Sequence, residues 1–457
     1  MSVTKAAQYN LRPPAVGGRS YSYKVQAQHG ATSITGSRSK VVEFMIPCSA
    51  NTLLDQSQSY LTFLLKGGAS TTALDYSAAS IIHRIEVYHG SNLLESIDNY
   101  NVLHTLMTDL TVDNTTRSGV LSAMMGIDES PAPAINPASS PATATELEAY
   151  LNANVVGSKA KRIGIKPGTA GTQIALPIAL SGILSPASQK YLPLYMMQSD
   201  SLRLQITLED PSKAMVDSSA GTVSYTLEDV SYVCQFIELS SDVCGAIMQE
   251  AHAVGGGVTR ISSESFRGFE TNLAGSQSGF SIQVPARFSS LNSLYSTFRL
   301  APKGGSNDIE VRQPSISGRY QPAGLSYQYR IGSTLLPSQP VKTPESSLME
   351  VLKTFNAVTA ANFNTSITKT NWNATAASTT DAGVTASDYK GTFAVALETS
   401  LFANANDIVD SGKQSISEVV NFEGTMTTPV NVVTYVNTFA RFDMAIVISD
   451  GLATAVF

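Results

Sequence analysis

The sequence predicts an all-β protein made of two similar domains in tandem, and three observations support this prediction. Apolar and polar residues alternate in many short segments, which is the pattern of half-buried strands. The same landmarks occur twice, in the same order, about 240 residues apart. Each copy also holds one segment with helical spacing and one long polar insertion. A repeat of this length matches a whole β domain rather than the short unit of a solenoid.

Three landmarks define the duplication. Each copy opens with an alternating strand that ends at a proline, continues into the pattern Tyr-x-Thr-Phe-x-Leu, and reaches a Gly-Ser turn just before a Leu-Leu pair. The landmarks stand at Pro47, Tyr60 and Gly90 in the first copy and at Pro285, Tyr295 and Gly332 in the second. We therefore expect Tyr60 and Tyr295 to occupy equivalent strands of two similar barrels.

The first copy contains the expected strands of one barrel and a helix. Alternating residues predict strands at 21–28, 42–46, 60–65, 81–88, 93–97, 174–180 and 202–208. Gly90 lies in a predicted hairpin turn, because glycine tolerates positive φ. The helix is about three turns long, and its apolar face is expected at Tyr100, Leu103, Met107 and Leu110. Asp98 or Asn99 can cap its start.

The second copy repeats this order. Strands are predicted at 280–284, 295–300, 325–331, 335–341, 393–397 and 442–448. Thr343 is a capping hydroxyl, followed by Pro344 at the first helical position and Glu345 at the positive end of the helix dipole. The buried stripe of this helix is expected at Leu348, Leu352 and Phe355. About eight strands per copy is the jelly-roll number, so the predicted fold is two tandem eight-stranded jelly rolls, each with a short helix and a long loop insertion.

Composition marks the boundaries between the predicted domains. The long insertions are 128–154, rich in Pro, Ala and Ser, and 357–390, rich in Asn, Thr and Ala. Between the copies, Ser240, Ser241 and Asp242 can cap a short helix that a run of three glycines ends. The expected division is a flexible basic arm at 1–20, a first jelly roll at 21–240, a linker with a short helix and the glycine run at 241–257, and a second jelly roll at 258–457.

The chain carries few charges, and they are unevenly distributed. Charged residues make up only 14% of it. A low-charge surface is typical of proteins buried in assemblies, but a secreted polar β protein has the same composition. No acidic residue precedes Glu43, and the basic residues before it include Lys5, Arg12 and Arg19. Such an arm can contact nucleic acid, a membrane surface or a neighbouring subunit, or can be a solvated tail.

The cysteines and the N-terminus indicate where the protein assembles. Cys48, Cys234 and Cys244 are odd in number and lack the spacing of a zinc site or a disulfide framework. Free thiols favour a reducing compartment. The first ten residues contain no apolar signal core, and no apolar run reaches the roughly 18 residues that cross a bilayer. We therefore expect assembly inside a cell rather than secretion.

No catalytic, cofactor-binding or metal-ligating residues can be assigned from the sequence. His83 and His89 can share one face of a hairpin, but a metal site needs further ligands. Glu209 and Asp210 precede Pro211 and read as a strand end that enters a turn rather than a catalytic pair. Neither a G-x-S-x-G motif nor a phosphate-binding loop is present. The sequence therefore predicts a protein that is not an enzyme and has no cofactor.

Several segments resemble the double jelly-roll major capsid proteins of the lineage that includes adenovirus and tailless membrane-containing phages. The segment at 193–204, ProLeuTyrMetMetGlnSerAspSerLeuArgLeu, is similar to the one before the last strands of the first barrel. Second-barrel segments are similar to Phe288-x-x-Leu291-x-Ser293-Leu294, to Gly318-Arg319-Tyr320 and to the segment at 326–332. The resemblance is greatest to polinton-like virus and virophage proteins and extends over nearly the whole chain after residue 20.

The resemblance implies a major capsid protein in a virion, whose homotrimers form pseudo-hexagonal capsomers that tile an icosahedral shell. It implies contacts with neighbouring capsomers and with penton and minor capsid proteins. The two insertions would be outward tower loops, with Trp372, Asn373 and Tyr389 in the second. The arm at 1–18, with Lys5 and Arg12, would face inward toward an internal membrane, a minor protein or the genome.

Two other functions stay open on the sequence alone. A glycan-binding β-sandwich, either an adhesin or a viral receptor-binding spike, would use loop aromatics such as Trp372 and Tyr389 to contact host surface glycans. A hydrolase on a jelly-roll frame would need paired carboxylates at inward-facing strand positions. Those positions carry Leu, Ile, Phe and Val, which favours the structural function over the enzymatic one.

Overall fold

The computed structural model describes residues 18–28, 33–68, 72–127, 164–185, 191–217, 223–255, 258–300, 316–358, 365–373, 391–400, 412–428 and 433–457. The predicted insertion at 128–154 lies outside these residues, and so does most of the one at 357–390. Most of the predicted arm at 1–20 lies outside them as well.

The first unit is a barrel of two antiparallel layers. Its main strands are β1 (Arg19–Gln26), β3 (Val41–Ile46), β4 (Thr52–Gly67), β6 (Ile82–His89), β7 (Asn92–Asp98), β8 (Thr172–Leu176), β9 (Leu202–Leu208) and β11 (Tyr225–Glu238). One layer has the order β1-β11-β4-β8 and the other β3-β9-β6-β7. Strand β2 (Ser33–Thr35) adds to β11, while β5 (Thr72–Leu74) and β10 (Met215–Asp217) pair separately.

The second unit repeats this topology. Its strands are β12 (Thr259–Leu273), β13 (Gly279–Val284), β14 (Leu291–Leu300), β15 (Ser326–Ile331), β16 (Thr334–Val341), β17 (Val395–Glu398), β18 (Val420–Thr425), β19 (Thr434–Ser449) and β20 (Leu452–Val456). The layers have the orders β12-β19-β14-β17 and β13-β18-β15-β16, and β20 adds to β19. Each main strand of the first unit therefore has a counterpart at the same place in the second, which confirms the prediction of two tandem eight-stranded jelly rolls.

The sequence landmarks lie at equivalent places in these layers. Tyr60 is in β4 and Tyr295 is in β14, each the third strand of its layer. Gly90 and Gly332 form the turns of the β6–β7 and β15–β16 hairpins with φ of 59° and 60°. A side chain would be strained at this φ, so the two glycines are required by the same turn. The predicted equivalence of Tyr60 and Tyr295 is confirmed.

Each unit has one main helix beside its hairpin, and one of the two predicted caps forms. The helices are α1 (Tyr100–Thr111) and α7 (Pro344–Lys353). Thr343 Oγ1 accepts a hydrogen bond from Ser346 N at 3.2 Å, as predicted. The predicted side-chain cap of α1 is wrong, because Asn99 is in the left-handed region with φ of 51° and makes no capping bond. Asp98 pairs with Arg84 instead.

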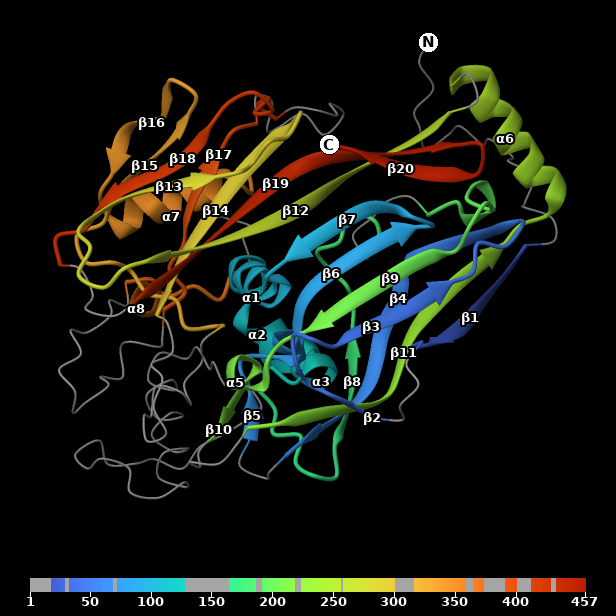
Figure 1. Cartoon of the computed structure of the whole chain (residues 1–457), viewed down its shortest axis with the longest axis horizontal. Helices are drawn as coiled ribbons and strands as arrows, with labels where there is room; N and C mark the ends of the chain where they lie inside the picture. Colours follow the sequence, from blue (N-terminus) through green and yellow to red (C-terminus); the bar gives the residue numbers. More distant parts are fainter. Residues whose placement is uncertain are drawn as a thin grey trace, which may run out of the picture.

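Other helical segments complete the described chain. They are η2 (Ala78–Ile81), α2 (Asn114–Thr116), η3 (Arg117–Leu121), α3 (Ser122–Met125), η4 (Leu194–Met196), α5 (Pro211–Ala214), α6 (Ser241–Gly255) and α8 (Lys369–Trp372). Helix α6 separates β11 from β12, and Figure 1 shows it projecting at one end of the molecule. The division of the chain into an arm, two jelly rolls and a linker remains a proposal.

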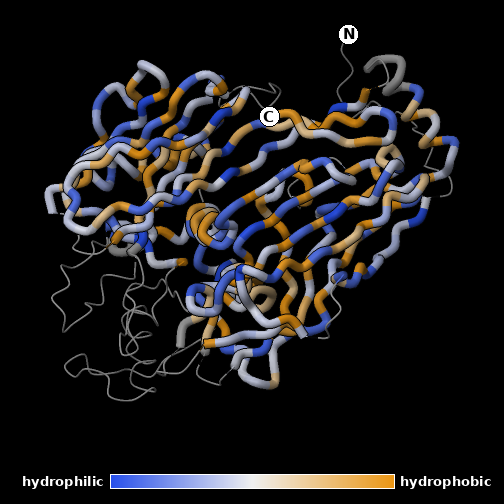
Figure 2. Tube along the Cα trace, viewed as in Figure 1, coloured by the Kyte–Doolittle hydropathy of each residue, from blue (hydrophilic) through white to orange (hydrophobic). Residues whose placement is uncertain are grey.

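The cores of the two units are built from alternating residues, as Figure 2 shows along the strands. In the second unit, the rings of Phe280, Phe298 and Phe422 lie 5.1–5.9 Å apart between their centroids. In the first, Phe44 packs against Tyr232 with centroids 6.3 Å apart. These aromatic contacts join the two layers of each barrel.

A long ribbon joins the two barrels. Strands β12 and β19 are 15 and 16 residues long and continue past the layers of their own unit. Figure 1 shows β12, β19 and β20 lying across the strand β7 of the first unit. The even-numbered residues of β19, among them Met444, Ile446 and Ile448, are buried along the ribbon. The second unit therefore covers part of the first.

Candidate assembly interface

The tip of the ribbon is held by hydrogen bonds to the first unit. His89 Nδ1 accepts from Ala453 N at 3.0 Å, and its Nε2 donates toward the backbone oxygens of Met197 and Asp200 at 3.0 and 3.1 Å. Asn92 Nδ2 donates to Ala453 O at 3.2 Å. Both ring nitrogens of His89 are thus occupied by hydrogen bonds. They leave no lone pair for a metal.

Glu95 connects the middle of the ribbon to the first barrel. Its buried carboxylate accepts hydrogen bonds from Ser181 Oγ, from Gly182 N at 2.7 Å and from Ser265 Oγ in β12. Burial raises the pKa of the Glu95 carboxyl, against the opposing effect of the Ser181 and Ser265 hydrogen bonds. A buried carboxylate with three donors joins one strand of the second unit to two segments of the first.

Asp75 makes a second buried connection. It is fully buried and accepts from Ile316 N and Ser317 Oγ at 2.6 Å each. Ile316 and Ser317 precede β15 in the second unit and are themselves buried. Hydrogen bonds to a charged group are stronger than neutral ones, so this contact fixes the entry of the second unit against the first.

Asp109 makes the third connection, near the C-terminal end of α1. Its carboxylate accepts from Arg319 Nη2 at 2.5 Å and from Tyr76 OH at 3.0 Å, with Arg117 Nη1 at 3.6 Å. Its backbone oxygen accepts from Thr365 Oγ1 at 2.9 Å. An acid here is disfavoured by the helix dipole, and the two buried guanidinium groups offset that cost. Both units supply donors to one residue.

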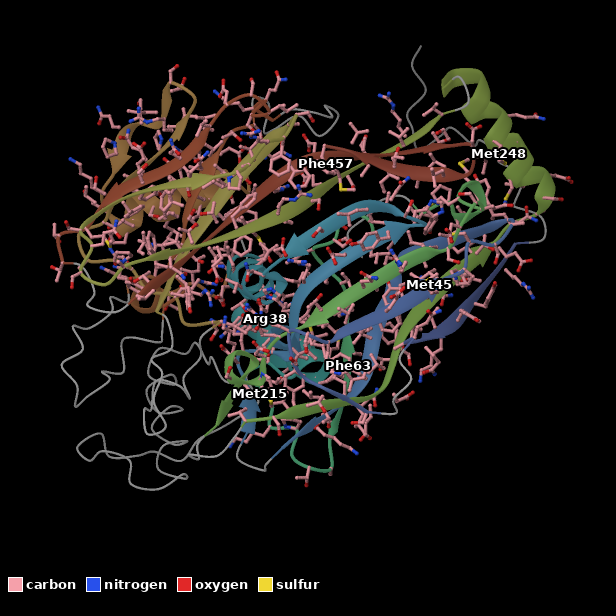
Figure 3. The ribbon with its side chains drawn as sticks, viewed as in Figure 1. Arg38, Met45, Phe63, Met215, Met248 and Phe457 are labelled. Atoms are coloured by element: carbon pink, nitrogen blue, oxygen red, sulfur yellow. The ribbon has the colours of Figure 1, made fainter. Side chains whose placement is uncertain are left out.

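A small polar cavity lies at the same contact. It is lined by Arg38, Asn99, Asn101, Val102, Glu209, Lys213, Glu270, Arg299, Ile316 and Tyr435, and measures about 10 Å³. Burial raises the pKa of Glu209, but hydrogen bonds and charges from His83 and Arg38 outweigh it, so the pKa lies well below the usual range. Figure 3 shows Arg38 at the junction of the units. The space suits about one water molecule rather than a substrate.

Among the described residues, no three His, Cys, Asp or Glu side chains are grouped so as to hold a metal ion. Within the same ranges, no helix has both the length and the apolar character needed to cross a bilayer. The three cysteines are free thiols, and burial raises the pKa of Cys48 to about 11. A thiol with so high a pKa is a weak nucleophile at neutral pH.

The structure places three of the six residues predicted for the arm and the tower loop. Arg19 lies in β1 and pairs with Glu238 at 2.7 Å. The ring of Trp372 is buried, with Nε1 donating to Pro344 O at 2.7 Å and its centroid 5.2 Å from that of Phe393. Asn373 follows at the end of α8, half-buried. Lys5, Arg12 and Tyr389 lie outside the described residues. The roles assigned to these six residues stay predictions.

The sequence did not predict the residues that join the units. Arg319 was singled out only as part of a segment that resembles the capsid proteins. Asp109 offers a signal, since it is an acid among the apolar residues of a predicted helix face. Asp75 and Glu95 offer none, because each stands in a segment that reads as an ordinary strand or turn. Their partners lie 170 or more residues away in sequence. Such pairings follow only from the folded topology.

No family model and no curated protein matches this chain. Solved structures do match it. A chain of the Sputnik virophage structure is 12% identical with a TM-score of 0.59, covering 100% of this chain and 92% of that one. The PBCV-1 virus capsid is 11% identical with a TM-score of 0.57 and 99% coverage of both chains. The mavirus major capsid protein is 8% identical with a TM-score of 0.52, covering 100% and 94%. The chain therefore has the double jelly-roll fold of viral major capsid proteins.

Proposed function

We propose that this chain is a major capsid protein whose homotrimers form pseudo-hexagonal capsomers in the icosahedral shell of a DNA virus. One observation carries the proposal: the fold matches capsid chains over almost the whole length of both chains. Both barrels, their order and their connection are included in that match. A chance likeness of one barrel would not extend over the pair.

The contact between the barrels supports the same function. Three chains can form a tile with six similar positions only if the two barrels of each chain keep one fixed position relative to each other. Asp75, Glu95 and Asp109 provide this, since each is buried and accepts donors from the second unit. Breaking the buried pair of Asp109 and Arg319 costs roughly 3–5 kcal/mol, which resists a hinge between the barrels.

A tile of this kind makes further contacts inside a virion. Each trimer contacts neighbouring capsomers, penton proteins and minor capsid proteins, and the protein resides in the virion after assembly inside the host cell. Lys5, Arg12 and Arg19 belong to an arm directed at an internal membrane, a minor protein or the genome. The loop after α7 faces outward and is the part available to a host glycan.

The mass of the native protein in solution tests the proposal. Light scattering is expected to give about 145 kDa, three times 48.4 kDa, and negative-stain images are expected to show a hexagonal outline. A protein that stays monomeric at all concentrations, with no shell formed on co-expression with its own penton protein, contradicts the capsomer. Screening the same sample on a glycan array then examines the adhesin or spike alternative. The buried ring of Trp372 does not favour that alternative.

A further inference from the structure

The two units of one chain contact each other through unlike surfaces. The second unit uses β12 and the segment at 316–319, and the first uses β7 and α1. Ser265 of β12 donates to Glu95 of β7, and a Cβ at Gly268 would lie only 2.3 Å from Asp98 O. On the other side, α1 is covered so fully that eleven of its twelve residues are buried. The contact is therefore head-to-tail between two similar barrels.

The counterparts of these surfaces are uncovered. By strand order, β1 corresponds to β12, β16 to β7, and α7 to α1. Seven of the eight residues of β1 are exposed. Strand β16 buries only Val341, whereas β7 buries Leu94, Glu95 and Ile97. Helix α7 buries three of its ten residues. Each element that forms the contact inside the chain thus has a counterpart in the other unit that is more exposed.

The register of the strands shows which residues correspond. Leu61 pairs with Tyr232 in the first unit, and Ser296 pairs with Thr438 in the second, one residue after the landmark tyrosine in each case. Four residues farther along β11 and β19 than Tyr232 and Thr438, Phe236 corresponds to Phe442. Phe236 pairs with Tyr21 in β1, and Phe442 pairs with Ser265 in β12. Tyr21 therefore occupies the position of Ser265, and Tyr23 that of Arg267.

The opposite surface is matched by its turn. Glu95 pairs with Val87, two residues before the end of β6, and Leu336 pairs with Tyr329, two residues before the end of β15, so Leu336 occupies the position of Glu95. Ser338 lies two residues farther along β16, as Ile97 does along β7. Met349 is the sixth residue of α7 and Thr105 the sixth of α1. Met349 is 41% exposed, whereas Thr105 is 2% exposed.

We propose that β1 of one copy packs on β16 of a second copy, beside α7, as β12 packs on β7 beside α1 within the chain. The inference rests on the proposed capsomer and names its subunit contact. Tyr21 and Tyr23, 36% and 48% exposed, and Met349 supply apolar area on the two sides. The contact is heterologous, since each copy offers one surface of each kind. Repeating one barrel-to-barrel relation closes three copies into a ring of six barrels.

Cross-linking between copies tests the contact directly. The variant Ser22→Cys with Ser338→Cys places one thiol in β1 and one in β16 of the same chain. Treatment of the full-length protein with a short bismaleimide is expected to give covalent dimers and trimers on a denaturing gel. Each single variant has the same native cysteines, Cys48, Cys234 and Cys244, and is expected to give neither. Trimers by mass with no covalent species in the double variant overturn the inference but leave the capsomer intact.

Charge on either surface gives an independent result. Two variants add charge: the double variant Tyr21→Asp with Tyr23→Asp, and the single variant Met349→Asp. Each is expected to shift the protein from trimer to monomer. The protein concentration below which the trimer dissociates is expected to rise at least tenfold over wild type. The matched control is Val120→Asp, because Val120 is an exposed apolar residue, 62% exposed, on the segment η3. It is expected to stay trimeric. A monomeric wild type overturns the capsomer itself, whereas a trimeric Tyr21/Tyr23 variant overturns only the proposed contact.

Discussion

The carboxylate of Asp109 and the guanidinium group of Arg319 meet at 2.5 Å, with neither side chain accessible to solvent. They come from different barrels and are 210 residues apart in sequence. Two charges held this closely out of water are strongly stabilised only while both are present. The pair therefore ties the relative position of the barrels to the stability of the whole chain.

Replacing Arg319 by Met leaves Asp109 short of its main charge partner. We expect the free energy of unfolding to fall by roughly 3–5 kcal/mol, measured by urea denaturation of the purified protein. The matched control is Arg330→Met, which removes a half-exposed surface pair with Glu423 at 3.0 Å. Exposed pairs contribute about 0–1 kcal/mol. Equal losses in the two variants would show that burial of the Asp109 pair has no special weight.

His104 is expected to make the protein less stable in mild acid. Burial lowers the pKa of His104 from 6.5 to about 4. As pH falls, the His104 ring is therefore protonated in the unfolded chain at a higher pH than in the folded protein. The stability that the neutral ring provides is complete above pH 6.5 and is lost as pH falls toward 4, by roughly 3 kcal/mol in total. Thermal midpoints of wild type and His104→Gln across this range measure it. Parallel curves for the two proteins would contradict the assignment.

The cap of α7 is expected to contribute measurably to stability. Thr343→Ala removes the acceptor for Ser346 N and should cost about 1 kcal/mol. Thr343→Ser keeps a hydroxyl at the same place and should cost less than half as much. Chemical denaturation separates the two, and a serine variant as unstable as the alanine variant would mean that the methyl group of threonine, not the cap, matters.

Trp372 provides an internal probe, because it is the only tryptophan in the chain. Its ring is buried against Phe393. We expect blue-shifted fluorescence that acrylamide quenches little in the native protein and that shifts to the red on unfolding. Trp372→Phe should also lose the hydrogen bond to Pro344 O, at a cost of about 1 kcal/mol. Strong quenching in the native state would place the ring in solvent instead.

Sequence reasoning recovered the fold through residues whose local roles are strict. Gly90 and Gly332 mark the same turn because positive φ admits few other residues, and Tyr60 and Tyr295 mark the same strand. It recovered the start of α7 from Thr343 and Pro344, since capping depends on neighbours in sequence. The predicted cap at Asn99 was wrong, because the backbone of Asn99 is in the left-handed region and its side chain makes no capping hydrogen bond.

Contacts between distant segments could not be predicted in the same way. Glu95 reads as a polar residue on a strand, and only the folded ribbon brings Ser265 to it. Trp372 reads as part of an outward loop, yet its ring is covered by Phe393 and the start of α7. The burial of these side chains depends on how two barrels lie together. Local pattern carries no information about that relation.

The ribbon also has a consequence for synthesis on the ribosome. Strand β7 is covered by β12 and β20, and both of these strands pair with β19 (Thr434–Ser449). A nascent chain that has completed the first barrel must wait for more than 200 further residues before this strand is fully covered. At about 5–20 residues per second, that interval lasts tens of seconds at the slower rate. Ser265 lies in β12, whose pairing partner β19 is made after both β7 and β12. A chain cut short before β19 therefore presents an unfinished surface to quality control.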